Sequence, residues 1–221
     1  MLRCAFMLKA VLWDMDGTLV DSEEVHWLAW KEVMDAEGVA VTYQQFRDTF
    51  GQRNDTIIPL LLGGTLTSET VARISDTKEA AYRRMVRERG IVTIDGAVEW
   101  VKRLREQGWR QAIASAAPRA NIDAILEVLG LHAYFDAAVP AEDVLRGKPD
   151  PQVFLLAAKR LGVEPARSIV VEDGRAGVEG ASRAGMRSIG LARDGGELPA
   201  DIVVRSFGEL PPDAFERLLA L

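Results

Sequence analysis

Six short apolar runs, separated by helix-like stretches, constrain the fold of this 221-residue chain more than any other feature of its sequence. The first run, residues 9–14, ends on charge and meets Gly17, a pattern typical of a buried strand that enters a turn. The other runs are residues 111–114, 137–139, 168–171, 187–191 and 202–204. Alternation of such runs with helical patterns predicts an α/β fold with a Rossmann-like, doubly wound parallel sheet covered on both faces.

The helical patterns between these runs have well-marked ends. They span residues 97–107, 119–129, 151–161 and 175–184. A glycine stands just past each pattern, where a left-handed residue is favoured: Gly108, Gly130, Gly162 and Gly185. Asp150 precedes Pro151, which places a capping side chain before a first-turn proline. These signals fix the order of helices and strands from about residue 91 onward.

The interval between the first and second strands is much longer than the dozen or so residues that a parallel crossover needs. It contains four stretches rich in Ala, Glu, Arg and Leu, which are helix formers: residues 23–37, 42–50, 55–62 and 68–89. We therefore expect an all-helical cap domain at residues 21–90, inserted into an α/β core domain of residues 1–20 and 91–221. Two adjacent linkers would join the two domains.

The net charge and the cysteine content indicate which binding partners and which cellular compartment to expect. Acidic residues number 33 against 27 basic ones, a net charge of −6 that argues against binding to nucleic acid or to an anionic membrane surface. No apolar run reaches the roughly 18 residues of a membrane helix. The single cysteine, Cys4, cannot form an intrachain disulfide, which favours a cytoplasmic location. We expect a monomer whose partner is a small molecule.

Polar side chains follow several of the predicted strands, where ligands bind in an open parallel sheet. They are Asp14, Asp16 and Thr18 after the first strand, Ser115 after the second, Lys148 before the helix that begins near Pro151, and Glu172 and Asp173 after residues 168–171. Four carboxylates in one crevice, facing a single lysine, repel one another unless a cation lies among them. Because the donors are all oxygens, Mg²⁺ is the natural candidate, and it would hold a phosphate together with Lys148.

The two aspartates at positions 14 and 16 suit two different chemical roles. An ionised carboxylate can attack phosphorus to form an aspartyl phosphate, while a second carboxyl protonates the leaving oxygen and then activates water. The alternative for each pair taken singly is structural: Asp14 and Asp16 as turn formers, Glu172 and Asp173 as a helix N-cap. The occurrence of all of them at successive strand ends favours the chemical interpretation.

The ordered motifs resemble those of the haloacid dehalogenase superfamily. They are Asp14-Met-Asp-Gly-Thr-Leu-Val-Asp21-Ser22, then Ile113-Ala-Ser115, Gly147-Lys148-Pro149-Asp150-Pro151 and Val171-Glu172-Asp173-Gly-Arg-Ala-Gly177-Val. The match spans nearly the whole chain, and the helical insert resembles the cap of the β-phosphoglucomutase-like phosphatase branch. Gly174 departs from the pattern, since Ser or Thr is common there.

The resemblance implies a set of roles. Asp14 would be the nucleophile and Asp16 the general acid and base, while Ser115 and Lys148 would contact the transferring phosphate. Mg²⁺ would be bound by the Asp14 side chain, the Asp16 backbone carbonyl and Asp173, with Glu172 acting through water.

Four residues of the insert match sugar-phosphate-binding positions of the β-phosphoglucomutase group: His26, Trp30, Arg53 and Lys78. His26 and Trp30 lie four apart and share a helix face. The alternative is that His26 and Trp30 pack within the helical bundle, and that Arg53 and Lys78 are solvated charges like the arginines around them.

The loop after Ser115 differs from the mutase pattern. Where those enzymes resemble Ser-Ala-Ser-Lys-Asn, this chain has Ser115-Ala-Ala117-Pro118-Arg119. Arg119 would substitute as a bidentate phosphate partner at a helix start. The resemblance therefore favours a phosphatase acting on a small phosphorylated metabolite such as a sugar phosphate, with a β-phosphoglucomutase-type phosphomutase as the alternative.

Three further classes fit less well. A 2-haloacid dehalogenase attacks carbon and needs neither Asp16 nor a Mg²⁺ site. A receiver-type binding module would be near half this length. A regulatory, non-catalytic phosphate-binding protein is disfavoured by the intact Asp14, Asp16, Lys148 and Asp173.

Overall fold

The computed structural model describes residues 8–50 and 52–220, so Cys4 lies outside the described residues. Within these described residues, eight strands form two sheets: β1 (Ala10–Trp13), β2 (Val20–Asp21), β3 (Val92–Thr93), β4 (Arg110–Ala114), β5 (Ala137–Val139), β6 (Ser168–Glu172), β7 (Arg187–Leu191) and β8 (Ile202–Val204). The helices are α1 (Glu23–Ala36), α2 (Tyr43–Thr49), α3 (Asn54–Leu62), α4 (Ser68–Arg89), α5 (Ala97–Glu106), α6 (Arg119–Leu129), α7 (Gln152–Leu161), α8 (Arg175–Arg183) and α9 (Ala214–Leu219).

The main sheet has six parallel strands in the order β5-β4-β1-β6-β7-β8. The chain passes from β1 to β4 on one side and later to β6 on the other, so the strand order reverses around β1. In such sheets the crevice outside the carboxyl ends of the central strands is where ligands bind. The predicted α/β fold with a doubly wound parallel sheet is confirmed.

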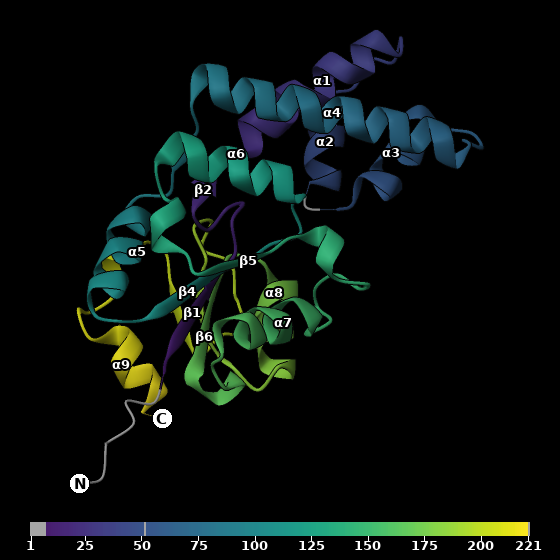
Figure 1. Cartoon of the computed structure of the whole chain (residues 1–221). Helices are drawn as coiled ribbons and strands as arrows, with labels where there is room; N and C mark the ends of the chain where they lie inside the picture. The colour runs from purple at the N-terminus through teal and green to yellow at the C-terminus, as the bar shows by residue number, and fades with distance from the viewer. Residues whose placement is uncertain (1–7, 51, 221) are drawn as a thin grey trace, which may run out of the picture.

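Helices cover both faces of this sheet (Figure 1). Val11 and Trp13 of β1 point into an apolar cluster that includes residues of α5, α6 and α9. Ala10 and Leu12 point to the opposite face, where α7 and α8 pack. Because β1 is buried on both faces, it has a continuous apolar sequence rather than an alternating one.

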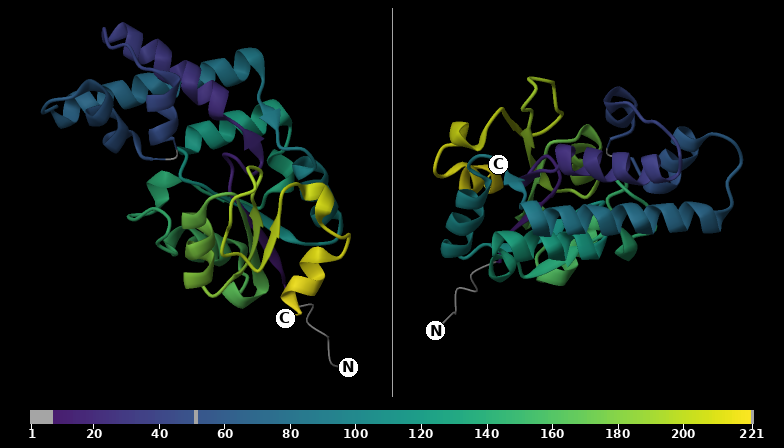
Figure 2. Two further views of the ribbon diagram at one scale, coloured as in Figure 1. Left: turned by 180° about the vertical axis from the view of Figure 1, so that it is seen from behind. Right: turned by 90° about the horizontal axis from the view of Figure 1, so that it is seen from above.

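Helices α1 to α4 form the helical insert, which lies at the end of the sheet toward which β1 runs (Figure 1). Figure 2 shows α1 and α4 side by side, and α4 also contacts α6 of the α/β part. The apolar cluster runs without a break from the insert, through Trp30 and Tyr82, to the face of the sheet. No helix in the described part of the chain combines the length and apolarity that crossing a membrane requires.

The local signals in the sequence find their structural counterparts. The four glycines past the helical patterns have φ between 65° and 79°, the left-handed region that ends a helix. The Asp150 carboxylate accepts a hydrogen bond from the backbone N–H of Gln152, the first residue of α7, at 3.0 Å, while Pro151 occupies the N-cap position rather than the first turn. The two linkers of the insert pair as a short antiparallel ribbon of β2 and β3, an element that the sequence did not reveal.

Candidate active site

Three neighbouring strands end together at the carboxyl edge of the sheet. Trp13, the last residue of β1, is in register with Ile113 of β4 and Val171 of β6. The next residues along the chain include Asp14, Ser115 and Glu172. The Asp14 backbone N–H donates to the Val171 carbonyl at 3.0 Å and so continues the β1–β6 ladder. Strand register thus places these side chains at one point.

Lys148 joins two of the carboxylates at this edge. Its ammonium donates to Asp14 Oδ1 at 2.5 Å and to Glu172 Oε1 at 2.6 Å. Burial alone would lower the pKa of the Lys148 ammonium, but the two carboxylates outweigh this effect and raise it. Lys148 is therefore a permanent positive charge beside Asp14.

Glu172 and Asp173 are held by backbone and hydroxyl donors. Glu172 Oε2 accepts from the Gly174 N–H at 2.7 Å, and Asp173 Oδ1 accepts from the Thr18 hydroxyl at 3.1 Å. Two glycines leave room for these carboxylates. A Cβ on Gly17 would lie 2.1 Å from Asp173 Oδ2, and one on Gly177 would lie 1.9 Å from Glu172 Oε1.

The negative charge of this cluster exceeds what Lys148 can balance. Carboxylate oxygens of Asp14, Glu172 and Asp173 lie within 4.8 Å of one another. Burial, with the nearby Glu172, raises the pKa of Asp173 to about 6, and burial raises that of Asp14 well above its ordinary value against the pull of Lys148. A carboxylate trio in which burial raises the pKa of Asp14 and of Asp173 fits a metal ion, which supplies the missing positive charge.

Asp16 faces away from this trio, toward the helical insert. Its Oδ1 accepts a hydrogen bond from the Ser22 hydroxyl at 2.5 Å and lies 3.6 Å from His26 Nε2. Burial would raise the pKa of Asp16, but the contacts with His26 and Ser22 lower it overall. The two aspartates at positions 14 and 16 thus occupy different environments, although they are two residues apart.

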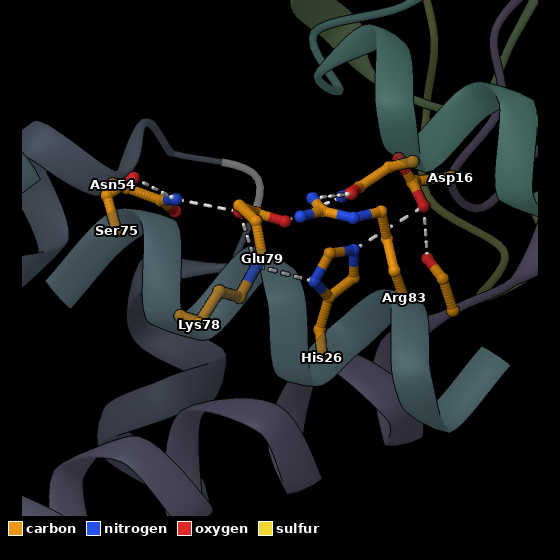
Figure 3. A network of polar contacts seen from close by, with 9 residues as sticks. Asp16, His26, Asn54, Ser75, Lys78, Glu79 and Arg83 are labelled. Carbon is orange, nitrogen blue, oxygen red and sulfur yellow. Dashed lines mark hydrogen bonds and ion pairs between the residues drawn. The ribbon is translucent and has the colours of Figure 1, made fainter. Parts of the chain in front are cut away.

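His26 links Asp16 to a buried polar network of the insert (Figure 3). Its Nδ1 is 2.9 Å from Lys78 Nζ, and its ring stacks on Tyr82 at a centroid distance of 4.1 Å. Because an ammonium can only donate, Nδ1 accepts from Lys78 and the ring proton lies on Nε2, toward Asp16. Burial and Lys78 lower the pKa of His26, consistent with a neutral ring.

The insert residues that the sequence singled out differ in how far they are exposed to solvent. Lys78 is 3% exposed and Trp30 is 2% exposed, so Lys78 is not the solvated charge that the alternative interpretation expected. Lys78 Nζ lies 5.3 Å from the centre of the Trp30 ring. The Arg53 guanidinium is exposed and pairs with Asp55 at 3.1 Å.

Ser115 directly follows β4 at the carboxyl edge of the sheet, whereas the Arg119 side chain has partners elsewhere. Ser115 is buried after β4, and its hydroxyl accepts from the Ala117 N–H at 3.0 Å. The Arg119 guanidinium donates to the Ala138 carbonyl at 3.0 Å and to Asp143 at 3.1 Å. The Arg119 guanidinium is thus paired with the chain around β5, and its use as a phosphate partner stays a prediction.

Glu79 and Asn121 join the network although the sequence did not draw attention to them. Glu79 follows Lys78 on α4, and Asn121 lies in the first turn of α6. Arg83 Nη1 donates to Asn121 Oδ1 at 3.1 Å. A single acidic residue on a highly charged helix carries no sequence signal of burial, since its burial depends on how α4 packs against α3 and α6.

Comparison with known proteins agrees with this geometry. The model of a family described as haloacid dehalogenase-like hydrolase matches residues 8–185. A phosphorylated carbohydrates phosphatase of Thermotoga maritima is 31% identical over 186 residues, which cover 82% of this chain and 84% of the relative. A beta-phosphoglucomutase of Bacillus subtilis is 30% identical over 210 residues, or 92% of each chain. The crystal structure of a HAD hydrolase of family IA, variant 3, from Entamoeba histolytica superposes with a TM-score of 0.86 at 26% identity and covers 97% of this chain and 100% of that one.

Proposed function

Because the chain belongs to the haloacid dehalogenase-like hydrolase family, we propose that it is a Mg²⁺-dependent phosphatase that hydrolyses a small phosphorylated metabolite through an aspartyl phosphate on Asp14. The observation that carries this proposal is the arrangement at the end of β1. There Asp14 contacts Lys148 at 2.5 Å and shares a cluster with Glu172 and Asp173. A nucleophilic carboxylate beside a fixed cation is what attack on a phosphate monoester requires.

Asp14 supplies the nucleophile in the first half of the reaction. A carboxylate oxygen of Asp14 forms a bond to phosphorus as the bond to the leaving oxygen breaks, and the phosphoryl group moves onto Asp14. Lys148 balances negative charge on the phosphoryl oxygens, and the buried Ser115 hydroxyl, next to Ala117, offers a further donor. Water then attacks phosphorus and frees Asp14.

Asp14, Asp173 and the backbone carbonyl of Asp16 would hold Mg²⁺, with Glu172 acting through water. Bound there, the ion neutralises charge on the phosphate and on the clustered carboxylates. The donors are all oxygens, which suits this hard cation. Thr18 and Gly174 keep Asp173 and Glu172 in place through the hydrogen bonds already described.

Asp16 is suited to move protons. It gives a proton to the leaving oxygen in the first half-reaction and takes one from the attacking water in the second. In the free protein the pKa of Asp16 is lowered despite burial, because His26 and Ser22 stabilise its carboxylate. A phosphate dianion bound nearby would raise that pKa and favour the protonated acid.

A carbohydrate phosphate is the substrate class that we propose, with the helical insert acting as a cap domain over it. Two relatives with names that refer to phosphorylated carbohydrates or phosphoglucose support this class. Within the insert, His26 and Lys78 lie on the side of Asp16, and they and Arg53 stay proposals as substrate contacts. A monomer and a cytoplasmic location stay predictions.

A phosphomutase is the second candidate, favoured by the match to a beta-phosphoglucomutase over 92% of the chain. Phosphatase and mutase would share Asp14, Asp16 and Lys148 and differ in whether water or a sugar hydroxyl accepts the phosphoryl group. The loop after Ser115 lacks the second polar set of the mutase pattern, and Arg119 is engaged with Asp143. These features favour hydrolysis.

Phosphorus NMR distinguishes the two candidates. The purified protein is incubated with Mg²⁺, β-glucose 1-phosphate and a trace of glucose 1,6-bisphosphate, beside an EDTA control. We expect metal-dependent inorganic phosphate from this substrate or from others in a panel of sugar phosphates. Conversion to glucose 6-phosphate would instead establish a mutase. A protein that consumes no phosphate monoester in the panel would contradict both.

A further inference from the structure

The Glu79 carboxylate connects three separate segments of the chain. Glu79 Oε1 accepts from Asn54 Nδ2 of α3 at 2.7 Å and from Lys78 Nζ of α4 at 2.9 Å. Glu79 Oε2 accepts from Asn121 Nδ2 of α6 at 2.6 Å. Two of these partners belong to the helical insert and the third to the α/β part. Figure 3 shows Glu79 between Asn54 and Lys78, with Arg83 nearby.

This group is buried and ionised. Glu79 is 8% exposed, Lys78 3% and Asn121 1%. Burial opposes ionisation of Glu79, but Lys78, Asn54 and Asn121 lower its pKa overall. A buried ion pair adds little to stability by comparison with apolar packing, although leaving one partner alone is costly. Removing one member of this group is therefore expected to leave a buried charge without its partner.

A continuous series of contacts leads from Glu79 to Asp16. Lys78 Nζ, held by Glu79, lies 2.9 Å from His26 Nδ1, and His26 Nε2 lies 3.6 Å from Asp16 Oδ1. The position of Lys78 decides which ring nitrogen of His26 carries the proton. That proton faces Asp16, so the contact with Asp16 depends on where Glu79 holds Lys78.

We propose that Glu79 is a positioning residue that makes the His26 contact with Asp16 depend on the seating of the helical insert against α6. When α4 is seated, Asn121 completes the Glu79 site, and Lys78 is oriented toward His26. When α4 moves off α6, Glu79 loses Asn121, and the ion pair is exposed to water. This inference rests on the proposed function, because it assigns proton transfer to Asp16.

Two substrates with different leaving groups distinguish a positioning role of Glu79 from a purely structural one. A sugar alkoxide needs a proton from Asp16 as it leaves, whereas p-nitrophenolate leaves without one. Weakened positioning of Asp16 therefore slows hydrolysis of a sugar phosphate more than that of p-nitrophenyl phosphate. A general loss of folded protein lowers both rates by the same factor.

The first test is Glu79→Gln, compared with Glu88→Gln, which removes an exposed carboxylate of the same helix that pairs with Arg84. Asn54, Lys78 and Asn121 all donate hydrogen bonds to the Glu79 carboxylate. A glutamine at this position has one oxygen acceptor and one NH₂ donor, so its NH₂ group would face at least one of these donors. We expect kcat/KM for the sugar phosphate to fall about tenfold, which is 1.4 kcal/mol, and p-nitrophenyl phosphate hydrolysis to change less than threefold or so. Equal losses on both substrates, or a result like that of Glu88→Gln, would overturn the proposal.

The second test is Asn121→Ala, alone and combined with Glu79→Gln. Residues that act through one shared contact have non-additive effects, so the double variant is expected to match the single Glu79→Gln variant. If Glu79→Gln does not fold, as judged by circular dichroism, the substrate ratio of Asn121→Ala decides. An unchanged ratio in Asn121→Ala refutes the link to α6. Wild-type protein with no phosphatase activity refutes the proposed function itself, and this result is read first.

Discussion

At the scale of the residue, the three clustered carboxylates around Asp14 have one lysine and one hydroxyl as their side-chain partners within the described part of the chain. Lys148 is shared between Asp14 and Glu172, and Asp173 has the Thr18 hydroxyl as its partner. Two of the three carboxylates have raised pKa values in the absence of a metal. The site is therefore prepared for added positive charge, and it holds Asp14 against a fixed cation for attack.

Replacing Asp14 by asparagine tests the nucleophile. We expect Asp14→Asn to lower phosphate release by at least about 10³-fold, because losing a nucleophile removes most of an enzyme's rate enhancement. The melting temperature should not fall, since a neutral amide removes a buried charge that is costly there. Asp76→Asn, at an exposed position of α4, is the matched control. Turnover by Asp14→Asn within tenfold or so of the wild type would contradict the assignment.

Gly17 tests the close approach of Asp173 to the first loop. Gly17 has a φ of 84°, and an added Cβ would lie 2.1 Å from Asp173 Oδ2. We expect Gly17→Ala to displace Asp173, to weaken Mg²⁺ binding and so to raise the Mg²⁺ concentration needed for half-maximal activity. Gly108→Ala has a similar φ of 79° with nothing within 4 Å of the added Cβ, so it carries the backbone cost of about 1 kcal/mol alone.

The measurement is the activity of each of the two glycine variants as a function of Mg²⁺ concentration. Equal metal requirements in Gly17→Ala and Gly108→Ala would show that Asp173 does not need its present position.

The sequence predicted which residues lie close together where their side chains follow the ends of neighbouring parallel strands. The proximity of Asp14, Lys148, Glu172 and Asp173 followed from their places after buried strands, and the structure brings them together. The direction of the Arg119 side chain could not be anticipated, because it depends on Asp143 and the Ala138 carbonyl from a later loop. The burial of Lys78 and Glu79 depends on how α4 packs, which local sequence does not encode.

At the scale of the element, sequence pattern was informative for elements that bury their own apolar residues. The predicted helix of residues 119–129 and strand of residues 137–139 coincide with α6 and β5. The ribbon of β2 and β3 was not predicted, because strands of two residues are too short to show an alternating hydrophobic pattern. Their pairing of Val20 with Thr93 exists only once the insert has closed the chain on itself.

The loop after β6 makes stability depend on pH in a direction unusual for an aspartate. Asp173 has a pKa of about 6 in the metal-free fold, against an ordinary value of 3.8. The folded state thus binds the proton more tightly, so this contribution is fully present below about pH 4 and is lost as pH rises through about 6. The contribution of Asp173 to the free energy of unfolding should fall by about 3 kcal/mol across this window, and Asp14, whose pKa burial also raises, acts in the same direction.

Denaturant titrations in EDTA at several pH values measure this effect. Asp173→Asn should flatten the slope, because it removes the titrating group, and Mg²⁺ should stabilise the wild type most near neutral pH, where the carboxylates are ionised. An identical pH dependence in wild type and Asp173→Asn would contradict this account of the metal cluster.

At the scale of the whole molecule, polar contacts join the helical insert to the α/β part at the carboxyl edge of the sheet. Ser22, Asp16 and His26 join the first loop to α1, and Glu79 and Arg83 join α4 to Asn121 of α6. Helices between the first two strands of the main sheet were predicted from the length of the interval, and α1 to α4 lie there, whereas a separate cap domain stays a prediction. The orientation of these helices on the sheet could not be predicted, because it depends on polar contacts between distant segments.

Arg53 offers a test of the insert as a specificity element. If Arg53 leaves Asp55 to bind a distant anionic group of the substrate, Arg53→Ala should reduce kcat/KM for such substrates by about tenfold or more. Hydrolysis of p-nitrophenyl phosphate should be spared. Arg73→Ala removes a similar exposed arginine, paired with Glu37, and serves as control. Equal effects of Arg53→Ala on both substrates would place Arg53 outside the specificity site.

The most direct measurement of the central proposal is acid quenching of the protein during turnover, followed by mass spectrometry of the peptide that contains Asp14. With Mg²⁺ and a sugar phosphate that the protein hydrolyses, we predict one added phosphoryl group on Asp14. The signal should be absent in EDTA. With p-nitrophenyl phosphate, whose leaving group needs no proton from Asp16, the signal should be increased in Asp16→Asn, where hydrolysis of the intermediate lacks its base. Turnover without a phosphorylated Asp14 in either protein, or phosphorylation at another residue, would contradict the account.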